Sequence, residues 1–304
     1  MPFQRRLFAL RRTQNLLAGC IFDRLACQKC FCVTFAESNK GSPQAVEWKG
    51  SDFIQRTISA MVGKGSVNHN SRKFKAENVN ADRSHLNIDY CNENIKKVYH
   101  ELFDEALERY NDKQTRADRR IDDYYEKIRN SKQEKPFHEL ILQIGDKENM
   151  SAESENGQLA RQILDEYYRG FQERNPYLKV FSAHLHLDEA TPHLHIDFVP
   201  FTRGSKRGLD TRVSLKQALA AQGFKGGSRG NTEWSQWVQS EKEQLACVME
   251  RYGIEWEQKG THEKHLSVLD YKKQERAAEI QRLESKIEKK QTEFDVLSKR
   301  IKNF

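Results

Sequence analysis

Four of the ten histidines of this 304-residue chain lie within twelve residues, from His184 to His195. They form two His-x-His pairs, His184/His186 and His193/His195, on either side of the segment 187–192 (Leu-Asp-Glu-Ala-Thr-Pro). In an extended strand alternate side chains share a face, so the members of each pair point the same way. Apolar residues occupy the intervening positions: Phe181, Ala183, Leu185 and Leu187 before the break, and Leu194, Ile196 and Phe198 after it. This alternation predicts two antiparallel strands with one apolar face and one face that carries imidazoles.

The register of this hairpin decides whether the imidazoles meet. If His186 lies opposite His193 or His195, three rings share one patch, which requires a turn of even length, 189–192 or 187–192. A slip of one residue would send His186 to the other face. Neutral imidazoles fixed on rigid strands bind divalent metals and leave positions open for water or substrate. The alternative is a set of surface histidines on a solvated sheet face.

The stretch 186–195 (His-Leu-Asp-Glu-Ala-Thr-Pro-His-Leu-His) resembles the metal motif of the MobV-type relaxases, the plasmid mobilisation and recombination (Mob/Pre) family of HUH endonucleases. Two upstream segments, 69–72 (His-Asn-Ser-Arg) and 80–87 (Asn-Ala-Asp-Arg-Ser-His-Leu-Asn), are similar to that family's N-terminal motifs in order and spacing. The resemblance covers roughly residues 54–265. It implies an enzyme that nicks one DNA strand at an origin of transfer, holds the 5′-phosphate covalently and later rejoins the strand.

The resemblance also implies roles for individual residues. Three histidines would bind the metal, for which Mn²⁺ is preferred and Mg²⁺ or Zn²⁺ are alternatives: His186, His193 and His195. Glu189 would assist the metal, His69 would be the nucleophile, and Arg72 would hold or screen it. Tyr90 is the alternative nucleophile, because many HUH enzymes attack with tyrosine. A loop histidine without a catalytic role is the other interpretation of His69, and whether His184 is a fourth ligand stays open.

The charge balance permits a polyanionic partner without requiring one. The chain has 51 Lys and Arg against 44 Asp and Glu, a net charge of +7. Two glycine-rich basic segments, 203–208 and 225–230, follow the second histidine strand, and they are expected near the metal. Such loops bring cations and backbone N–H groups to phosphates, although many are only solvated connections. We therefore expect single-stranded or supercoiled origin DNA to contact six basic residues: Arg83, Arg203, Lys206, Arg207, Lys225 and Arg229.

Hydrophobic periodicity outlines the remaining elements. It predicts strands at 57–62, 137–144 and 254–256, the last as an edge strand, and helices at 94–110, 118–129, 159–171, 214–222 and 232–252. We expect an α+β fold in which a central antiparallel sheet is flanked by helices.

The C-terminal tail follows a different pattern. From residue 270 onward apolar residues recur at 3-4-3-4 spacing, broken only at Lys290: Ile280, Leu283, Ile287, Phe294, Leu297, Ile301 and Phe304. This heptad pattern predicts a C-terminal coiled-coil helix and a homodimer; an amphipathic helix that packs back on the domain is the alternative. Because the pattern still runs at the last residue, we expect a truncated coiled coil. The predicted domains are 1–52, 53–265 and 266–304.

Residues 1–52 differ in composition from the rest of the chain. They hold four of the six cysteines (Cys20, Cys27, Cys30 and Cys32), and no second knuckle follows that would complete a zinc site. Charged residues at 11 and 12 interrupt any signal-peptide core. We expect a disordered extension or a non-native start. No segment reaches the ~20 apolar residues that a bilayer span requires, so we expect a cytoplasmic protein without membrane insertion.

Four functions fit these features. A relaxase is favoured because the motif match is long, and a conjugative coupling protein would then be a further partner. A rolling-circle replication initiator shares the same chemistry. A zinc-dependent hydrolase would use the three histidines to hold a metal-bound water. A DNA-binding dimer would use the histidines for structure only.

Overall fold

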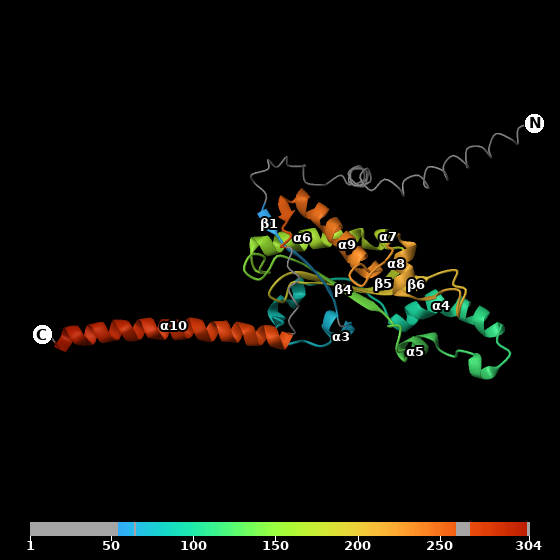
Figure 1. Cartoon of the computed structure of the whole chain (residues 1–304), viewed down its shortest axis with the longest axis horizontal. Coiled ribbons are helices and arrows are strands. Elements are labelled where there is room, and N and C mark those ends of the chain that lie inside the picture. The colour runs from blue at the N-terminus through green and yellow to red at the C-terminus, as the bar shows by residue number, and fades with distance from the viewer. Residues whose placement is uncertain (1–53, 64, 260–267, 303–304) are drawn as a thin grey trace, which may run out of the picture. The chain divides into compact units, whose positions relative to one another are not determined.

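The computed structural model describes residues 54–63, 65–259 and 268–302 of the chain. A central antiparallel sheet forms the middle layer of the part before residue 258. The strands follow the order β2-β4-β6-β5-β3, and the short β7 pairs with β6. Figure 1 labels β4, β5 and β6 of this sheet. All these pairings are antiparallel. The strand bounds are β2 (Ile58–Val62), β3 (Ile88–Asn92), β4 (His138–Ile144), β5 (Leu178–His186), β6 (His193–Thr202) and β7 (Arg212–Val213). The predicted α+β fold with a central antiparallel sheet is confirmed.

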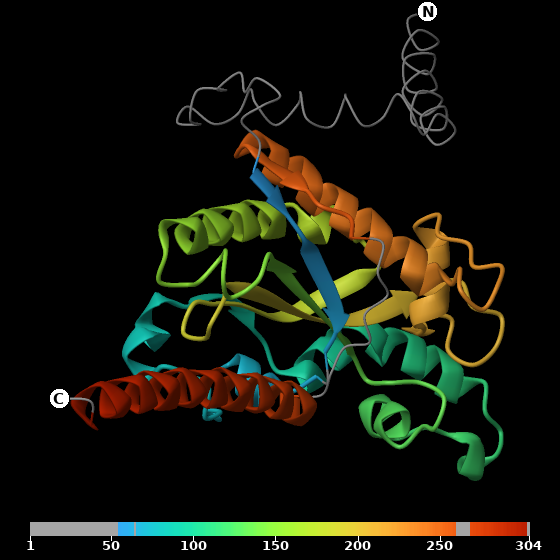
Figure 2. The ribbon, with the colours of Figure 1, turned by 60° about the vertical axis from the view of Figure 1, so that its left-hand side comes forward.

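Helices cover both faces of the sheet (Figure 2). One face packs against α6 (Glu155–Arg169), α7 (Phe171–Arg174), α8 (Leu215–Ala221) and α9 (Glu233–Arg251). The other face meets α4 (Ile95–Asp112) and α5 (Tyr124–Arg129), and it also carries the one-turn helix α3 (Val67–Asn70). Two 3-10 turns, η1 (Ala81–Leu86) and η2 (Ala117–Arg119), lie in the connections. A separate parallel pair joins β1 (Ile54–Arg56) to β8 (Ile254–Trp256).

Two apolar clusters hold these layers together. The larger one joins the sheet to α6, α8 and α9 through fully buried side chains, including Leu140, Leu142, Leu194, Ile196, Ile163, Leu164, Trp237 and Leu245. The smaller one joins the opposite face to α4 and α5, and includes Val98, Phe103, Tyr124, Val199 and Phe201. The apolar face predicted for Leu194, Ile196 and Phe198 is confirmed, because all three belong to the larger cluster. Their burial leaves the alternate positions of β6, which carry histidines, on the other face.

The prediction that Phe181 shares a face with Ala183 is wrong. The register between β5 and β6 shifts between Val180 and Ser182, which is a β-bulge. The extra residue turns Phe181 into the smaller cluster, where its ring centroid lies 5.2 Å from that of Phe137. Val180 and Ala183 both stay in the larger cluster. Because of the bulge, the regular alternation begins only after Phe181, where Ala183 and Leu185 face the larger cluster.

Most predicted elements agree with the structure within two residues: 57–62, 137–144, 254–256, 94–110, 214–222 and 232–252. The helix predicted over 118–129 is wrong in its first half, since α5 begins only after Asp123, whose side chain caps it by accepting from the Glu126 N–H. The helix predicted over 159–171 begins earlier, at Glu155, because Ser154 caps it, and ends at Arg169. Strand β3 was not predicted.

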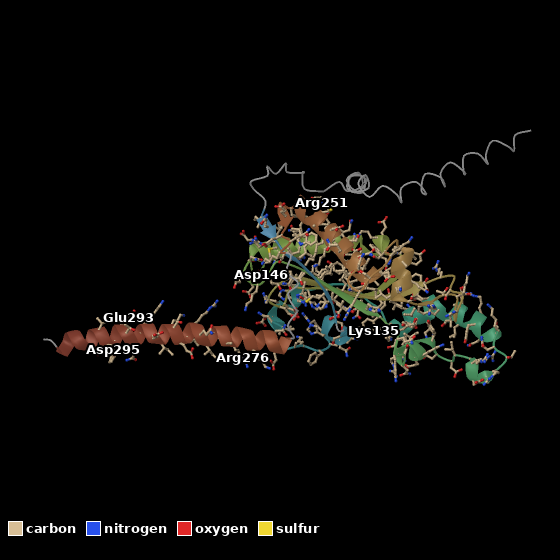
Figure 3. The ribbon with its side chains drawn as sticks, in the orientation of Figure 1. Lys135, Asp146, Arg251, Arg276, Glu293 and Asp295 are labelled. Carbon is tan, nitrogen blue, oxygen red and sulfur yellow. The ribbon has the colours of Figure 1, made fainter. Side chains whose placement is uncertain are left out.

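The C-terminal residues form a separate compact unit, Gln258–Phe304, which contains the continuous helix α10 (Val268–Lys302). Helix α10 carries exposed charged side chains of both signs, including Arg276, Glu293 and Asp295 (Figure 3). Four of the heptad residues are also exposed: Ile280, Leu283, Ile287 and Phe294. The coiled-coil dimer and the domain boundaries stay predictions, and the N-terminal extension 1–52 lies outside the described residues. Within those residues no helix is both long and apolar enough to cross a membrane.

His138 makes the stability of the fold depend on pH. Its ring stacks on Phe198 at 6.3 Å and lies 6.1 Å from Trp234. Burial, with the nearby Lys135 charge, lowers the pKa of His138 to about 4. Between pH 6.5 and 4 the unfolded chain therefore binds a proton that the folded chain does not, so the free energy of unfolding falls as the pH falls.

We expect His138→Phe to reduce this acid destabilisation by about 1–3 kcal/mol. Urea unfolding of both proteins at pH 7.5 and pH 4.5 measures it, and the difference between the two pH values is the quantity to compare. An equal loss of stability in the variant and the parent would contradict the assignment to His138.

Candidate active site

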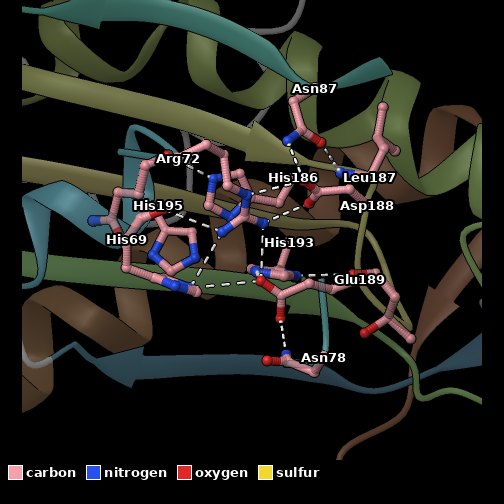
Figure 4. Close-up of polar contacts among 12 residues, drawn as sticks. His69, Arg72, Asn78, Asn87, His186, Leu187, Asp188, Glu189, His193 and His195 are labelled. Carbon is pink, nitrogen blue, oxygen red and sulfur yellow. Dashed lines mark hydrogen bonds and ion pairs between the residues drawn. The ribbon is translucent and has the colours of Figure 1, made fainter. Parts of the chain in front are cut away.

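The histidine hairpin adopts the register that brings its imidazoles together. His186 lies opposite His193 and His184 opposite His195, across the six-residue turn 187–192. This is one of the two even lengths predicted. The ring centroids of His186, His193 and His195 are 4.6–5.2 Å apart (Figure 4). Three of the predicted ligands thus form one buried cluster on the face opposite the larger apolar core.

Hydrogen bonds fix which nitrogen of each ring carries the proton. His186 Nε2 donates to the Asn70 carbonyl at 2.8 Å, and His193 Nδ1 donates to the Thr191 carbonyl at 2.8 Å, because a carbonyl only accepts. His195 Nδ1 donates to Glu139 Oε1 at 2.7 Å. The lone pairs are then on His186 Nδ1, His193 Nε2 and His195 Nε2. Such second partners orient imidazoles that bind metals.

The donor set fits a divalent metal. His186 Nδ1 and His195 Nε2 are buried and have no hydrogen-bond partner among the described residues, an arrangement that is costly unless something binds them. Two overlapping sets of ligand atoms lie within 4.8 Å of one another: His69, His186 and His195, and His186, Glu189 and His193. A metal ion would satisfy both orphaned nitrogens at once.

The local environment keeps these rings neutral. Burial, with the neighbouring His195 and His193, lowers the pKa of His186 to about 2. Burial also lowers the pKa of His195 to about 4, although its hydrogen bond to Glu139 acts in the opposite direction. Only neutral imidazole binds a metal, so both rings are ready ligands at neutral pH.

His69 lies on α3 at the edge of the imidazole cluster. Its ring centroid is 6.0 Å from that of His186 and 6.1 Å from that of His195. Its Nε2 lies 3.5 Å from Glu189 Oε1 and 3.3 Å from Arg72 Nη1. The side chain is 23% exposed, more than His193 or His195, so it is the imidazole of this group that a large substrate reaches most easily.

Arg72 is held in place by Asp188, a residue that the sequence reasoning missed. Arg72 has a φ of 54°, the left-handed region that non-glycine residues rarely adopt. Its guanidinium makes a two-pronged bond with the buried Asp188, with Nε donating to Oδ2 at 2.9 Å, and it also donates to Glu189 Oε1 at 2.9 Å. Ser84 and Asn87 donate to the same Asp188 oxygen. Both lie in the 80–87 motif, which is the sequence feature that could have pointed to Asp188.

Glu189 lies between His69 and the imidazole cluster. Its Oε1 contacts His69 and Arg72 and lies 3.9 Å from His193 Nε2, while its Oε2 accepts from Asn78 at 2.7 Å. Burial alone would raise the pKa of Glu189, but its contacts with His69, His193 and Arg72 outweigh it and hold the pKa well below its usual range. Glu189 is therefore an ionised carboxylate at neutral pH.

Asn70 connects α3 to the imidazole strands, which sequence reasoning also missed. Its side-chain amide donates to Glu139 at 2.8 Å and to Asp197 at 2.9 Å, and its carbonyl accepts from His186. Glu139 in turn lies against Gly63, where a Cβ would approach Glu139 Oε2 to 1.7 Å. Glu139 was detectable as an acidic residue directly before the apolar run 140–142 of the same strand. These contacts couple the position of α3, which carries His69, to His186 and His195.

A family model described as "Plasmid recombination enzyme" matches residues 63–273, which include every residue of this site. The chain belongs to the plasmid recombination enzyme family. The predicted Mob/Pre membership is thereby confirmed. A plasmid recombination enzyme of Bacillus sp. is 24% identical over 245 residues, covering 78% of this chain and 49% of the relative. A plasmid recombination enzyme type 2 of Staphylococcus aureus is 27% identical over 145 residues, covering 47% and 30%. The chain spans about half the length, or less, of these curated relatives.

Solved structures of the MobM relaxase domain bound to plasmid pMV158 oriT DNA are also similar. One Mn-bound crystal structure has a TM-score of 0.42 and 23% identity, and covers 71% of this chain and 98% of that chain. A second has a TM-score of 0.43 and 22% identity, with coverages of 71% and 99%.

In this member of the family, Tyr90 lies on the opposite face of the sheet from His69. It occupies a bulge of β3, its hydroxyl donates to Asp165 Oδ1 on α6 at 2.8 Å, and its ring lies 4.1 Å from that of Tyr168. Burial and the bond to Asp165 raise its pKa.

His184 is held by protein groups at both ring nitrogens. Asp89 of β3 lies 2.5 Å from His184 Nδ1, and Ser182 contacts His184 Nε2. Both nitrogens of His184 are therefore occupied by protein groups.

The predicted DNA-binding residues lie in three places. The segment 203–208 begins at the far end of β6 from the imidazoles: Arg203 is eight positions after His195, roughly 25 Å of strand. The expectation that this segment lies near the metal is therefore wrong. Lys225 and Arg229 lie in the loop between α8 and α9. Arg83, by contrast, donates to the Glu189 carbonyl at 3.0 Å and pairs with Glu153. The DNA contacts themselves stay predictions.

Proposed function

We propose that this member of the plasmid recombination enzyme family is a metal-dependent relaxase that nicks one DNA strand at an origin of transfer by transesterification and later religates it. One observation carries the proposal: an accessible imidazole, His69, lies beside an ionised carboxylate and a fixed arginine, at the edge of a cluster of neutral imidazoles with lone pairs available. Nucleophile, charge partner and metal ligands thus occupy one site.

His69 would attack the scissile phosphorus with its Nε2 lone pair. A P–N bond forms, the P–O3′ bond breaks, and the 3′ oxygen leaves and takes a proton from solvent. The 5′-phosphate is then held as a phosphoramidate, so the bond energy is retained, and attack by the 3′-hydroxyl reverses the step and rejoins the strand. The Glu189 carboxylate stabilises the positive charge that develops on His69. Arg72 keeps Glu189 in place and screens the unreacted imidazole.

A divalent metal held by His186, His193 and His195 would neutralise a non-bridging phosphate oxygen. Three imidazole nitrogens favour Mn²⁺ or Zn²⁺ over Mg²⁺, which prefers oxygen ligands; we propose Mn²⁺ and keep the other two as alternatives. Single-stranded origin DNA is the proposed substrate, and it would reach Arg203, Lys206 and Arg207 only if it extends ~25 Å along β6 from the cleavage point.

Incubation with 5′- or 3′-labelled single-stranded DNA and Mn²⁺ tests this function. Overlapping oligonucleotides from the DNA that flanks the gene serve as substrates, and denaturing gels separate free fragments from protein-linked ones. We expect label on the downstream fragment to migrate with the protein. Cleavage that leaves no protein-linked fragment would mean that water attacks, which favours the hydrolase, and absence of cleavage on every oligonucleotide would contradict the proposal.

The helix α10 is proposed as a homodimer contact. Removal of residues 270–304 should leave nicking within about two-fold of the full chain while lowering the oligomeric state, measured by sedimentation velocity. The double variant Ile280→Asp/Ile287→Asp tests the same seam without truncation, because both side chains are exposed on the isolated helix and a buried charge disrupts a coiled coil. If both variants sediment like the parent chain, α10 is not an association element.

A further inference from the structure

Phe74 is an exposed aromatic residue close in the chain to the proposed nucleophile. At 61% exposure it is the most exposed large apolar side chain in the described residues 54–259. It belongs to neither apolar cluster. Its two neighbours, Lys73 and Lys75, are also exposed. The segment thus presents an aromatic ring between two cations, five residues after His69.

The backbone fixes Phe74 near α3. Its N–H donates to the Asn68 carbonyl at 2.9 Å, directly beside His69. On one side the chain is held by Arg72, in its left-handed conformation and bonded to Asp188. On the other side Asn78 donates to Glu189 at 2.7 Å. Phe74 is therefore displayed from a turn that is tied to the active site at both ends.

We propose that Phe74 is a stacking platform for a nucleobase of single-stranded DNA next to the scissile phosphate, with Lys73 and Lys75 contacting the adjacent backbone phosphates. Aromatic rings interleaved with cations are how proteins hold single strands, because every base has a π-face and every nucleotide a charge. The hydrogen bond from the Phe74 N–H to the Asn68 carbonyl keeps this exposed residue close to His69 along the backbone, so a strand whose phosphate meets His69 would bring its neighbouring bases close to it. This inference rests on the proposed function, since its ligand is the DNA strand that His69 attacks.

Equilibrium binding to two fluorescent probes tests the platform. One probe is an oligonucleotide of twenty thymidines, and the other has the same sugar–phosphate backbone without bases. We expect Phe74→Ala to weaken binding of the thymidine probe about five- to hundred-fold and to change binding of the base-free probe less than two-fold. Phe74→Trp should restore the affinity for thymidine. Lys73→Ala/Lys75→Ala should weaken both probes and flatten their salt dependence.

Leu86→Ala is the matched control, because it also truncates an exposed apolar side chain in this region, and it should bind both probes like the parent. Equal weakening of both probes by Phe74→Ala, or no weakening of either, would overturn the platform. The binding is measured in EDTA, where no cleavage occurs. A chain that forms no covalent adduct but shows the Phe74 effect would therefore refute only the relaxase chemistry, and the converse result would refute only the stacking.

Discussion

His69→Ala will remove the covalent protein–DNA adduct, with a fall in adduct formation of about 10³-fold or more, because the attacking nitrogen is lost. The variant should still bind single-stranded DNA, since phosphate contacts elsewhere supply much of the affinity. It should also fold normally, because the His69 side chain is partly exposed and contacts only Arg72 and Glu189 through hydrogen bonds or ion pairs. Denaturing gels with labelled DNA and Mn²⁺ measure the adduct.

Tyr90→Phe provides the control for this experiment. It removes one hydroxyl, whose partner is Asp165 on the far side of the sheet, and should leave adduct formation unchanged. Loss of the adduct in Tyr90→Phe, together with its survival in His69→Ala, would make the tyrosine the nucleophile and contradict the geometry described above.

His193→Ala and His195→Ala should each abolish cleavage, because a metal site that loses one of three imidazoles no longer holds its ion in the geometry that the phosphate needs. Mn²⁺ binding, measured by calorimetry, should weaken by at least about ten-fold in both. DNA affinity should remain close to that of the parent chain. Cleavage at the parental rate, or unchanged Mn²⁺ binding, would remove the metal role from these residues.

The two variants differ in their effect on stability, which separates metal loss from misfolding. His195→Ala strips the buried Glu139 of the ring that donates to it and should cost about 1–3 kcal/mol of unfolding free energy in the absence of metal. Among the described residues His193 donates to the Thr191 carbonyl in the adjoining turn and to no buried carboxylate, so its replacement should cost less. Loss of cleavage in His193→Ala with near-parental thermal stability would therefore isolate the effect of the metal.

Local patterns predicted what depends on neighbours in the chain. The alternation around His186 and His193 fixed both the apolar face and the parity of the turn, because side-chain direction in a strand follows from position alone. Helix α9 was predicted because the helical spacing of apolar residues is likewise a local pattern. The bulge at Phe181 was not predicted, since one inserted residue reverses the alternation and leaves no compositional trace.

Contacts between distant segments were beyond the sequence. Asp188 and Arg72 are 116 positions apart, and no sequence periodicity predicts that they pair. Asn70 lay within a motif that was identified, yet its three contacts appear only when α3 is placed over β4, β5 and β6. The distance between the 203–208 segment and the imidazoles was misjudged for the opposite reason: neighbours along a fully extended strand end up far apart in space.

The six-residue connection between the two histidine strands limits how such chains can diverge. If a residue gained or lost there shifted the pairing of the two strands by one position, the imidazoles would enter the apolar interior and the leucines would take their place on the other face. A change of length therefore preserves the imidazole cluster only when the connection itself absorbs it and His186 stays opposite His193.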